Sequence, residues 1–153
     1  VIPGGTSTPL VPGDVMMSSV MSYDGMSKIG SMLGAGSVIV MDDTTCMVKT
    51  LERIAEFYYE ESCGQCTPCR EGTGWLYRVV KRIVHGEGTQ EDLDRLLAVA
   101  NNISGNTICA LGEAAATPVL SFIKHFEEEF QYHIDHKCSM VSSSNTSEGQ
   151  VAL

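Results

Sequence analysis

Three closely spaced cysteines are the residues of this chain with the clearest chemistry. Cys63, Cys66 and Cys69 form a C-x2-C-x2-C run, so a single loop can direct three thiolate sulfurs toward one centre. The same run opens the ligand pattern of bacterial [4Fe–4S] ferredoxins, whose fourth cysteine lies elsewhere. Cys109 is the nearest downstream candidate for that fourth ligand. The spacing therefore predicts an iron–sulfur site.

The segment between Cys69 and Cys109 is predicted to hold two helices, one running away from the cysteine run and one returning. The fourth thiol is then expected at the same end of the domain as the other three. Four thiolates around an iron–sulfur core leave net negative charge. Backbone N–H groups of the glycine-containing loop, and Arg70 beside Cys69, are expected to offset that charge.

Three other interpretations of these thiols remain open. A structural zinc site uses four cysteines, usually as two C-x2-C pairs. A thioredoxin-like pair at Cys66 and Cys69 requires a preceding strand, whereas an amphipathic helix is predicted here. Disulfides need an oxidising compartment, for which the sequence carries no signal.

The two remaining cysteines favour structural roles. Cys46 is expected in the first turn of a helix as a small buried hydrophobe. Cys138 follows His133 and His136 in a loose H-x2-H-x-C grouping, for which a solvated helix end is a better interpretation than a metal site. No Ser/His/Asp or Cys/His nucleophile set is evident, so no catalytic residue is predicted.

Two regions of different composition must position these cysteines. Residues 1–43 are rich in Gly, Pro, Ser and Met; they predict turns and a few strands, including a buried strand over residues 38–41. The opening VIPGG resembles the inside of a strand and its turn, so we expect a fragment of a longer chain. From Asp42 onward, helical periodicity begins.

The helical part predicts a mainly α fold, with a four-helix bundle as the simplest arrangement. The first helix is capped among residues 42–45 and runs to about Glu61. The second runs from about Thr73 to His85, with Trp75 on its buried face. Thr89 and Asp92 fit a capping box that opens the third helix, and residues 101–106 are expected to be a loop. Thr117 followed by Pro118 predicts the start of the fourth helix, whose inward side chains are Leu120, Ile123, Phe126 and Phe130.

Composition excludes two classes of partner. The chain has 153 residues and a net charge of −9, and so acidic a protein repels phosphate backbones, which argues against nucleic-acid binding. The longest nearly apolar stretch, residues 32–41, is far shorter than the roughly 20 residues that a membrane span needs. Direct membrane insertion is therefore not expected.

Three stretches, GSMLGAGSVIVMDDTTCMV, AEFYYEESCGQCTPCREGTGWLYRVV and GNTICALGEAAATPV, closely resemble the NADH-binding flavoprotein subunit of respiratory complex I. The resemblance covers about residues 1–137. It implies that residues 1–43 are the back half of a β-grasp (soluble-ligand-binding) domain and that residues 44–137 are a helical iron–sulfur domain. Residues 138–153 have no counterpart and are expected to be a disordered tail. The resemblance also implies that Cys63, Cys66, Cys69 and Cys109 ligate one [4Fe–4S] cluster.

In this family, electrons pass from NADH through FMN to the cluster and onward toward quinone. The implied partners are other peripheral-arm subunits, including a thioredoxin-like [2Fe–2S] subunit and a large multi-cluster iron–sulfur subunit. The implied location is peripheral, on the cytoplasmic face of a bacterial inner membrane or the mitochondrial matrix side. Ala110 and Leu111 are candidates to face the flavin.

The large FMN- and NADH-binding domain of the family has no match in this sequence, so the chain alone is expected neither to bind flavin nor to oxidise NADH. The same module also resembles the diaphorase subunits of NAD-linked hydrogenases and formate dehydrogenases. A zinc-stabilised helical interaction domain remains the non-enzymatic alternative.

Overall fold

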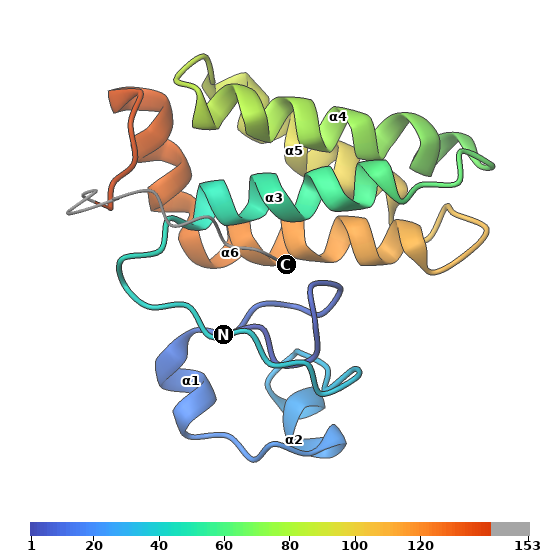
Figure 1. Ribbon diagram of the computed structural model, residues 1–153, viewed down its shortest axis with the longest axis vertical. Helices are drawn as coiled ribbons and strands as arrows, with labels where there is room; N and C mark the ends of the chain where they lie inside the picture. The colour runs from blue at the N-terminus through green and yellow to red at the C-terminus, as the bar shows by residue number, and fades with distance from the viewer. Residues whose placement is uncertain (142–153) are drawn as a thin grey trace.

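The computed structural model of the chain describes residues 1–141. This part contains six helices and no strand, so the predicted mainly α class is confirmed (Figure 1). Two short helices lie in the N-terminal segment and four longer ones follow: α1 (Gly13–Met17), α2 (Tyr23–Lys28), α3 (Met47–Glu60), α4 (Thr67–Val84), α5 (Gln90–Ile103) and α6 (Leu111–His136).

The four longer helices pack around a common core. α3 contacts α4 and α6, α5 contacts the same two helices, and α4 also contacts α6. Each amphipathic helix turns its apolar stripe inward. The largest fully buried apolar side chains of these helices are Leu51, Leu76, Ile83, Leu93, Leu96, Ile103, Phe122 and Phe130. Their burial is the main source of stability for this part of the chain.

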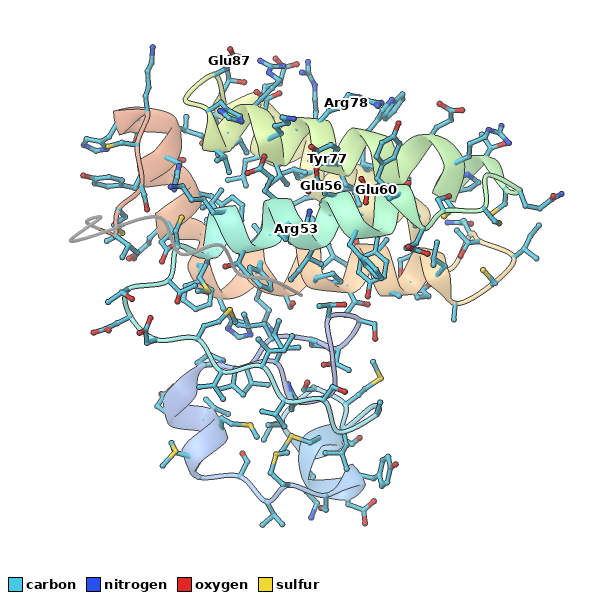
Figure 2. The ribbon with its side chains drawn as sticks, viewed as in Figure 1. Arg53, Glu56, Glu60, Tyr77, Arg78 and Glu87 are labelled. Carbon is cyan, nitrogen blue, oxygen red and sulfur yellow. The ribbon has the colours of Figure 1, made fainter. Side chains whose placement is uncertain are left out.

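The chain reverses direction from one long helix to the next. α3 and α5 therefore end where α4 and α6 begin. Figure 1 shows the α3–α4 and α5–α6 connections together at one end of the helices, the right-hand end in that view. Polar side chains also link α3 to α4 on their outer side. The Tyr77 hydroxyl donates to Glu56 Oε1 at 2.8 Å, and Arg53 pairs with Glu56 at 2.6 Å (Figure 2).

The prediction of a buried strand over residues 38–41 is wrong. Ile2 and Ile39 form one isolated antiparallel bridge, with both N–H···O distances 2.8 Å. The side chains of Val38, Ile39 and Val40 are 44%, 37% and 73% exposed. A buried strand needs partner strands and a covering layer, and the described residues supply neither.

The N-terminal segment is nevertheless anchored to the helices. Ile2 and Leu10 belong to the same buried core as the long helices. The Leu10 N–H donates to Ser121 Oγ at 3.2 Å, and the hydroxyls of Thr6 and Tyr58 lie 2.9 Å apart.

Several helix starts differ from the prediction. Asp42 Oδ1 accepts from the hydroxyls of Thr44 and Thr45, which closes a turn, and Cys46 is the N-cap of α3. α4 begins at Thr67 with Pro68 in its first turn, about two turns before the predicted start.

On α4, Trp75 is 54% exposed, so its predicted inward position is wrong. Leu76 and Val80 occupy the buried face. The fourth long helix, α6, already begins at Leu111 and contains Pro118, whereas Pro118 was expected at its first position.

The start of α5 matches the prediction. Thr89 Oγ1 accepts from the Asp92 N–H at 3.3 Å, while Asp92 Oδ2 accepts from the Thr89 N–H at 3.0 Å. This reciprocal capping box satisfies two N–H groups that a helix start leaves unpaired. The helix continues to Ile103, into the stretch that was predicted to be a loop.

Candidate metal centre

The cysteine run lies in the connection between α3 and α4. Cys63 is exposed, Cys66 is half-buried and Cys69 is buried. Cys66 is the N-cap of α4, and Cys69 lies in the first turn of that helix. The Cys69 sulfur lies 3.2 Å from Ser62 Oγ. The run therefore wraps the beginning of a helix, with its third thiol turned into the protein.

Glycine and arginine set the shape of this loop. Gly64 has a φ of +72°, a left-handed conformation that a Cβ disfavours. The Arg70 guanidinium donates to the Gly64 carbonyl at 3.1 Å and to Thr67 Oγ1 at 3.2 Å. It also pairs with Glu71 at 3.1 Å. Arg70 thus ties the loop to α4 and keeps a positive charge beside the cysteine run.

Cys109 lies in the connection between α5 and α6 and is exposed. The Thr107 hydroxyl donates to the Cys109 carbonyl at 2.9 Å. Glu113 accepts hydrogen bonds from Ser104 Oγ, at 2.7 Å, and from the Gly105 N–H. These hydrogen bonds hold the pKa of Glu113 below its usual range.

Gly112 shows how closely this loop folds onto α6. A Cβ at Gly112 would overlap the Thr107 side chain, so the loop approaches the helix at a point that only glycine allows. The loop carrying Cys109 is therefore held by both its hydrogen bonds and its packing.

Cys63, Cys66 and Cys109 come from the two connections at one end of the helices, and Cys69 comes from the first turn of α4 at the same end (Figure 1). Both α4 and α6 begin at this end, and helix N-termini carry partial positive charge. All four are free cysteines, and thiolate is the usual ligand of iron–sulfur clusters. The donor set and the local charge fit such a group. In residues 1–141, however, no three His, Cys, Asp or Glu side chains are already grouped closely enough to hold a metal ion.

The two residues expected to face a flavin follow Cys109 directly. Ala110 is exposed and is the N-cap of α6, and Leu111 is half-buried and packs against the core. Both therefore lie at the same end of the helices as the four thiols.

Sequence reasoning missed two features beside these loops. One is Ser62, whose hydroxyl meets the Cys69 sulfur; its position next to Cys63 was the available signal. The other is an open cavity of about 330 Å³ between the start of α4 and the end of α5, with Trp75 in its lining. Because Trp75 was predicted to point into the core, nothing in the sequence indicated a cavity lined by its side chain.

The interpretation of Cys46, His133 and Cys138 needs correction. Cys46 is half-buried at the N-cap of α3, not fully buried in its first turn. His133 is completely buried on α6, so a solvated helix end describes only His136 and Cys138, which are exposed. None of the helices described over residues 1–141 is both long enough and apolar enough to span a membrane.

Comparison with known proteins identifies the class. A family profile described as "NADH-ubiquinone oxidoreductase-F iron-sulfur binding region" matches residues 49–133. The NADH-quinone oxidoreductase F 1 subunit of Rhizobium meliloti is 52% identical over 88% of this chain, and the match covers 31% of that relative. The corresponding F subunit of Rickettsia bellii is 48% identical over 88% of the chain, and the match covers 32% of it.

Among solved structures, a crystal structure of an NAD+-reducing [NiFe]-hydrogenase in its H2-reduced state is similar, with a TM-score of 0.77 and 28% identity. The match covers 86% of this chain and 22% of that one. The matched family profile describes an iron–sulfur binding region, and the fold is similar to that of a chain of an NAD+-reducing hydrogenase.

Within that class, the chain belongs to the NADH-ubiquinone oxidoreductase-F iron-sulfur binding region family. The resemblance to the flavoprotein subunit of complex I is thereby confirmed. The chain spans about a third of the length of the curated relatives it matches.

Proposed function

We propose that Cys63, Cys66, Cys69 and Cys109 ligate a single [4Fe–4S] cluster that relays one electron at a time. The observation that carries this proposal is the placement of two connections, far apart in sequence, at the same end of the helices. Together with the first turn of α4 they carry four free thiols, and all four lie within the residues matched by the iron–sulfur family.

The cluster supplies the redox chemistry, and the residues of this chain hold and tune it. The N-terminal ends of α4 and α6 favour the negative charge of four thiolates. The Ser62 hydroxyl, 3.2 Å from the Cys69 sulfur, is placed to donate a hydrogen bond to that thiolate. Such hydrogen bonds raise the reduction potential of iron–sulfur clusters. Arg70 adds positive charge while fixing the Gly64 turn.

The electron source and acceptor lie in the longer protein and its complex. The donor is FMN reduced by NADH, with Ala110 and Leu111 on the flavin side of the cluster. The acceptors are the iron–sulfur centres of other peripheral-arm subunits, on the route to quinone. The location is peripheral, on the cytoplasmic face of a bacterial inner membrane or the matrix side. We expect this chain alone neither to bind FMN nor to oxidise NADH.

Residues 1–43 complete this proposal as part of a β-grasp domain. The bridge between Ile2 and Ile39 is a starting point for strand pairing, and the apolar run over Val38, Ile39 and Val40 is exposed. Additional strands from the longer protein would cover that run. The helical iron–sulfur domain is assigned to residues 44–137 and a tail to residues 138–153. Of that tail, residues 142–153 lie outside the described part.

The second candidate is the same module in an NAD-linked hydrogenase or formate dehydrogenase. The similarity to the NAD+-reducing hydrogenase supports it. The 52% identity to the NADH-quinone oxidoreductase F 1 subunit of Rhizobium meliloti, compared with 28% to the hydrogenase chain, favours the complex I assignment.

A ligand-replacement series tests the proposed cluster. We expect Cys109→Ser, prepared and reconstituted under anaerobic conditions, to retain clearly less iron and sulfide per chain than the parent protein. Cys138→Ser is the matched control, because Cys138 is also exposed but lies outside the two connections. Equal iron content in the Cys109→Ser variant and the parent would show that the fourth ligand is misassigned.

A further inference from the structure

A second pair of reactive groups lies at the other end of α3. Cys46 precedes α3, and its sulfur lies 3.2 Å from Nε2 of His133 on α6. The 14 residues of α3 separate this pair from the cysteine loop by about 20 Å. The pair is therefore distinct from the proposed cluster ligands.

The imidazole of His133 is unusually placed for a purely structural histidine. Its side chain is completely buried, and among the described residues its Nδ1 has no hydrogen-bond partner. Buried polar atoms of this kind are rare in proteins. The sulfur of Cys46 is therefore the polar contact that the structure gives this ring.

The surroundings keep the imidazole in its basic form. Burial lowers the pKa of His133, and Lys49 on α3 lowers it further, while Glu129 on α6 opposes both. At neutral pH the ring is therefore uncharged and able to accept a proton. A neutral imidazole within hydrogen-bond reach of a thiol has the geometry of a general base.

The backbone adds a second favourable element. Cys46 is the N-cap of α3, so its sulfur lies at the positive end of a 14-residue helix, which favours a developing thiolate. The Glu129 carboxylate, which accepts from the Met47 N–H at 2.9 Å, opposes a thiolate at Cys46 but stabilises the imidazolium that forms at His133. Cys46 is half-buried rather than fully buried, so part of this residue is accessible to small molecules.

We propose that Cys46 is a nucleophilic thiol, activated by His133, that is modified by small carbon electrophiles. With a haloacetamide, the sulfur forms a bond to carbon while the carbon–halogen bond breaks and the halide leaves with its electron pair. The thiol proton passes to Nε2 of His133 and then to solvent. No net oxidation or reduction takes place.

Iodoacetamide tests this site on the whole cluster-loaded chain. The protein is treated for increasing times at pH 7, quenched and digested, and the alkylated fraction of each cysteine is measured by peptide mass mapping. Cys138 is the internal control because it is more exposed than Cys46. We expect Cys46 to react about tenfold faster than Cys138, a modest general-base acceleration. An equal or slower reaction at Cys46 would overturn the proposal.

Two further measurements isolate the role of His133. His133→Asn is expected to remove the rate advantage of Cys46 and to leave the rate at Cys138 unchanged; a Cys46 rate that does not fall would exclude activation by the imidazole. The second measurement uses the parent protein, so it does not depend on the variant folding. Proton transfer to His133 during the attack predicts slower alkylation of Cys46 in D2O, and an unchanged rate would contradict that transfer.

Discussion

The contact between Gly72 of α4 and Ile103 of α5 links the two halves of the proposed metal centre. Gly72 lies one turn after Cys69, and Ile103 is the last residue of α5, before the loop that carries Cys109. A Cβ at Gly72 would lie 2.7 Å from Ile103 Cδ1 and 2.8 Å from its Cγ1. Ile103 is only 1% exposed but lines the open cavity between α4 and α5, so its side chain can relieve the overlap only by turning toward that cavity.

These distances give the size of the expected effects. Overpacking of a core destabilises a protein by about 1–3 kcal/mol, whereas alanine stabilises a helix by about 1 kcal/mol relative to glycine. Gly72→Ala should therefore lower the free energy of unfolding by about 0–2 kcal/mol. Ile103→Ala leaves a cavity and should cost about 2–5 kcal/mol. In the double variant, the new Cβ occupies part of that cavity.

A double-mutant cycle measures this contact directly. The free energy of unfolding of the four proteins is obtained from urea denaturation followed by far-UV circular dichroism. We expect the double variant to be more stable than the sum of the single changes by about 1–2 kcal/mol. Additivity within about 0.5 kcal/mol would refute the close approach of α4 and α5. If the contact also aligns the two cysteine loops, Gly72→Ala should lower the iron content of the chain.

Three further predictions concern other parts of the helical core. Thr89→Ala removes the capping box with Asp92 and should cost about 1 kcal/mol in urea denaturation, whereas Thr89→Ser should keep most of that stability. Phe130→Ala empties a fully buried site and should cost about 3–5 kcal/mol; Phe57→Ala, at a side chain 48% exposed, is the control with a much smaller loss. Burial lowers the pKa of His133, so the unfolded chain binds that proton more readily. The contribution of His133 is thus fully present above a pH of about 6.5 and is lost as the pH falls through the folded-state pKa, with a slope of at most about 1.4 kcal/mol per pH unit. His133→Leu should remove that part of the slope below a pH of about 6.5.

Local sequence signals predicted the features that depend on neighbouring residues. The capping box at Thr89 follows from side-chain chemistry three residues apart. The buried positions of Leu93, Leu96 and Ala100 follow from helical periodicity. The C-x2-C-x2-C run was evident because three thiols at that spacing are rare outside metal sites.

Features that depend on tertiary packing were missed. Trp75 adjoins Leu76 in a helical stripe, and only the placement of α5 and α6 decides which of them is buried. Thr117 followed by Pro118 is a typical helix-start signal, but α6 begins at Leu111, so both residues lie inside that helix. The pairing of Cys46 with His133 joins residues 87 positions apart, beyond the range of any local pattern.

The most direct test of the central claim is the metal content of the chain, purified anaerobically, together with its visible and electron paramagnetic resonance spectra before and after dithionite. A [4Fe–4S] cluster held between the two connections predicts about four irons with matching sulfide per chain. It also predicts broad visible absorbance and a paramagnetic signal that appears on reduction. One zinc per chain, with no iron and no colour, would contradict the electron-relay account and leave a zinc-stabilised helical domain.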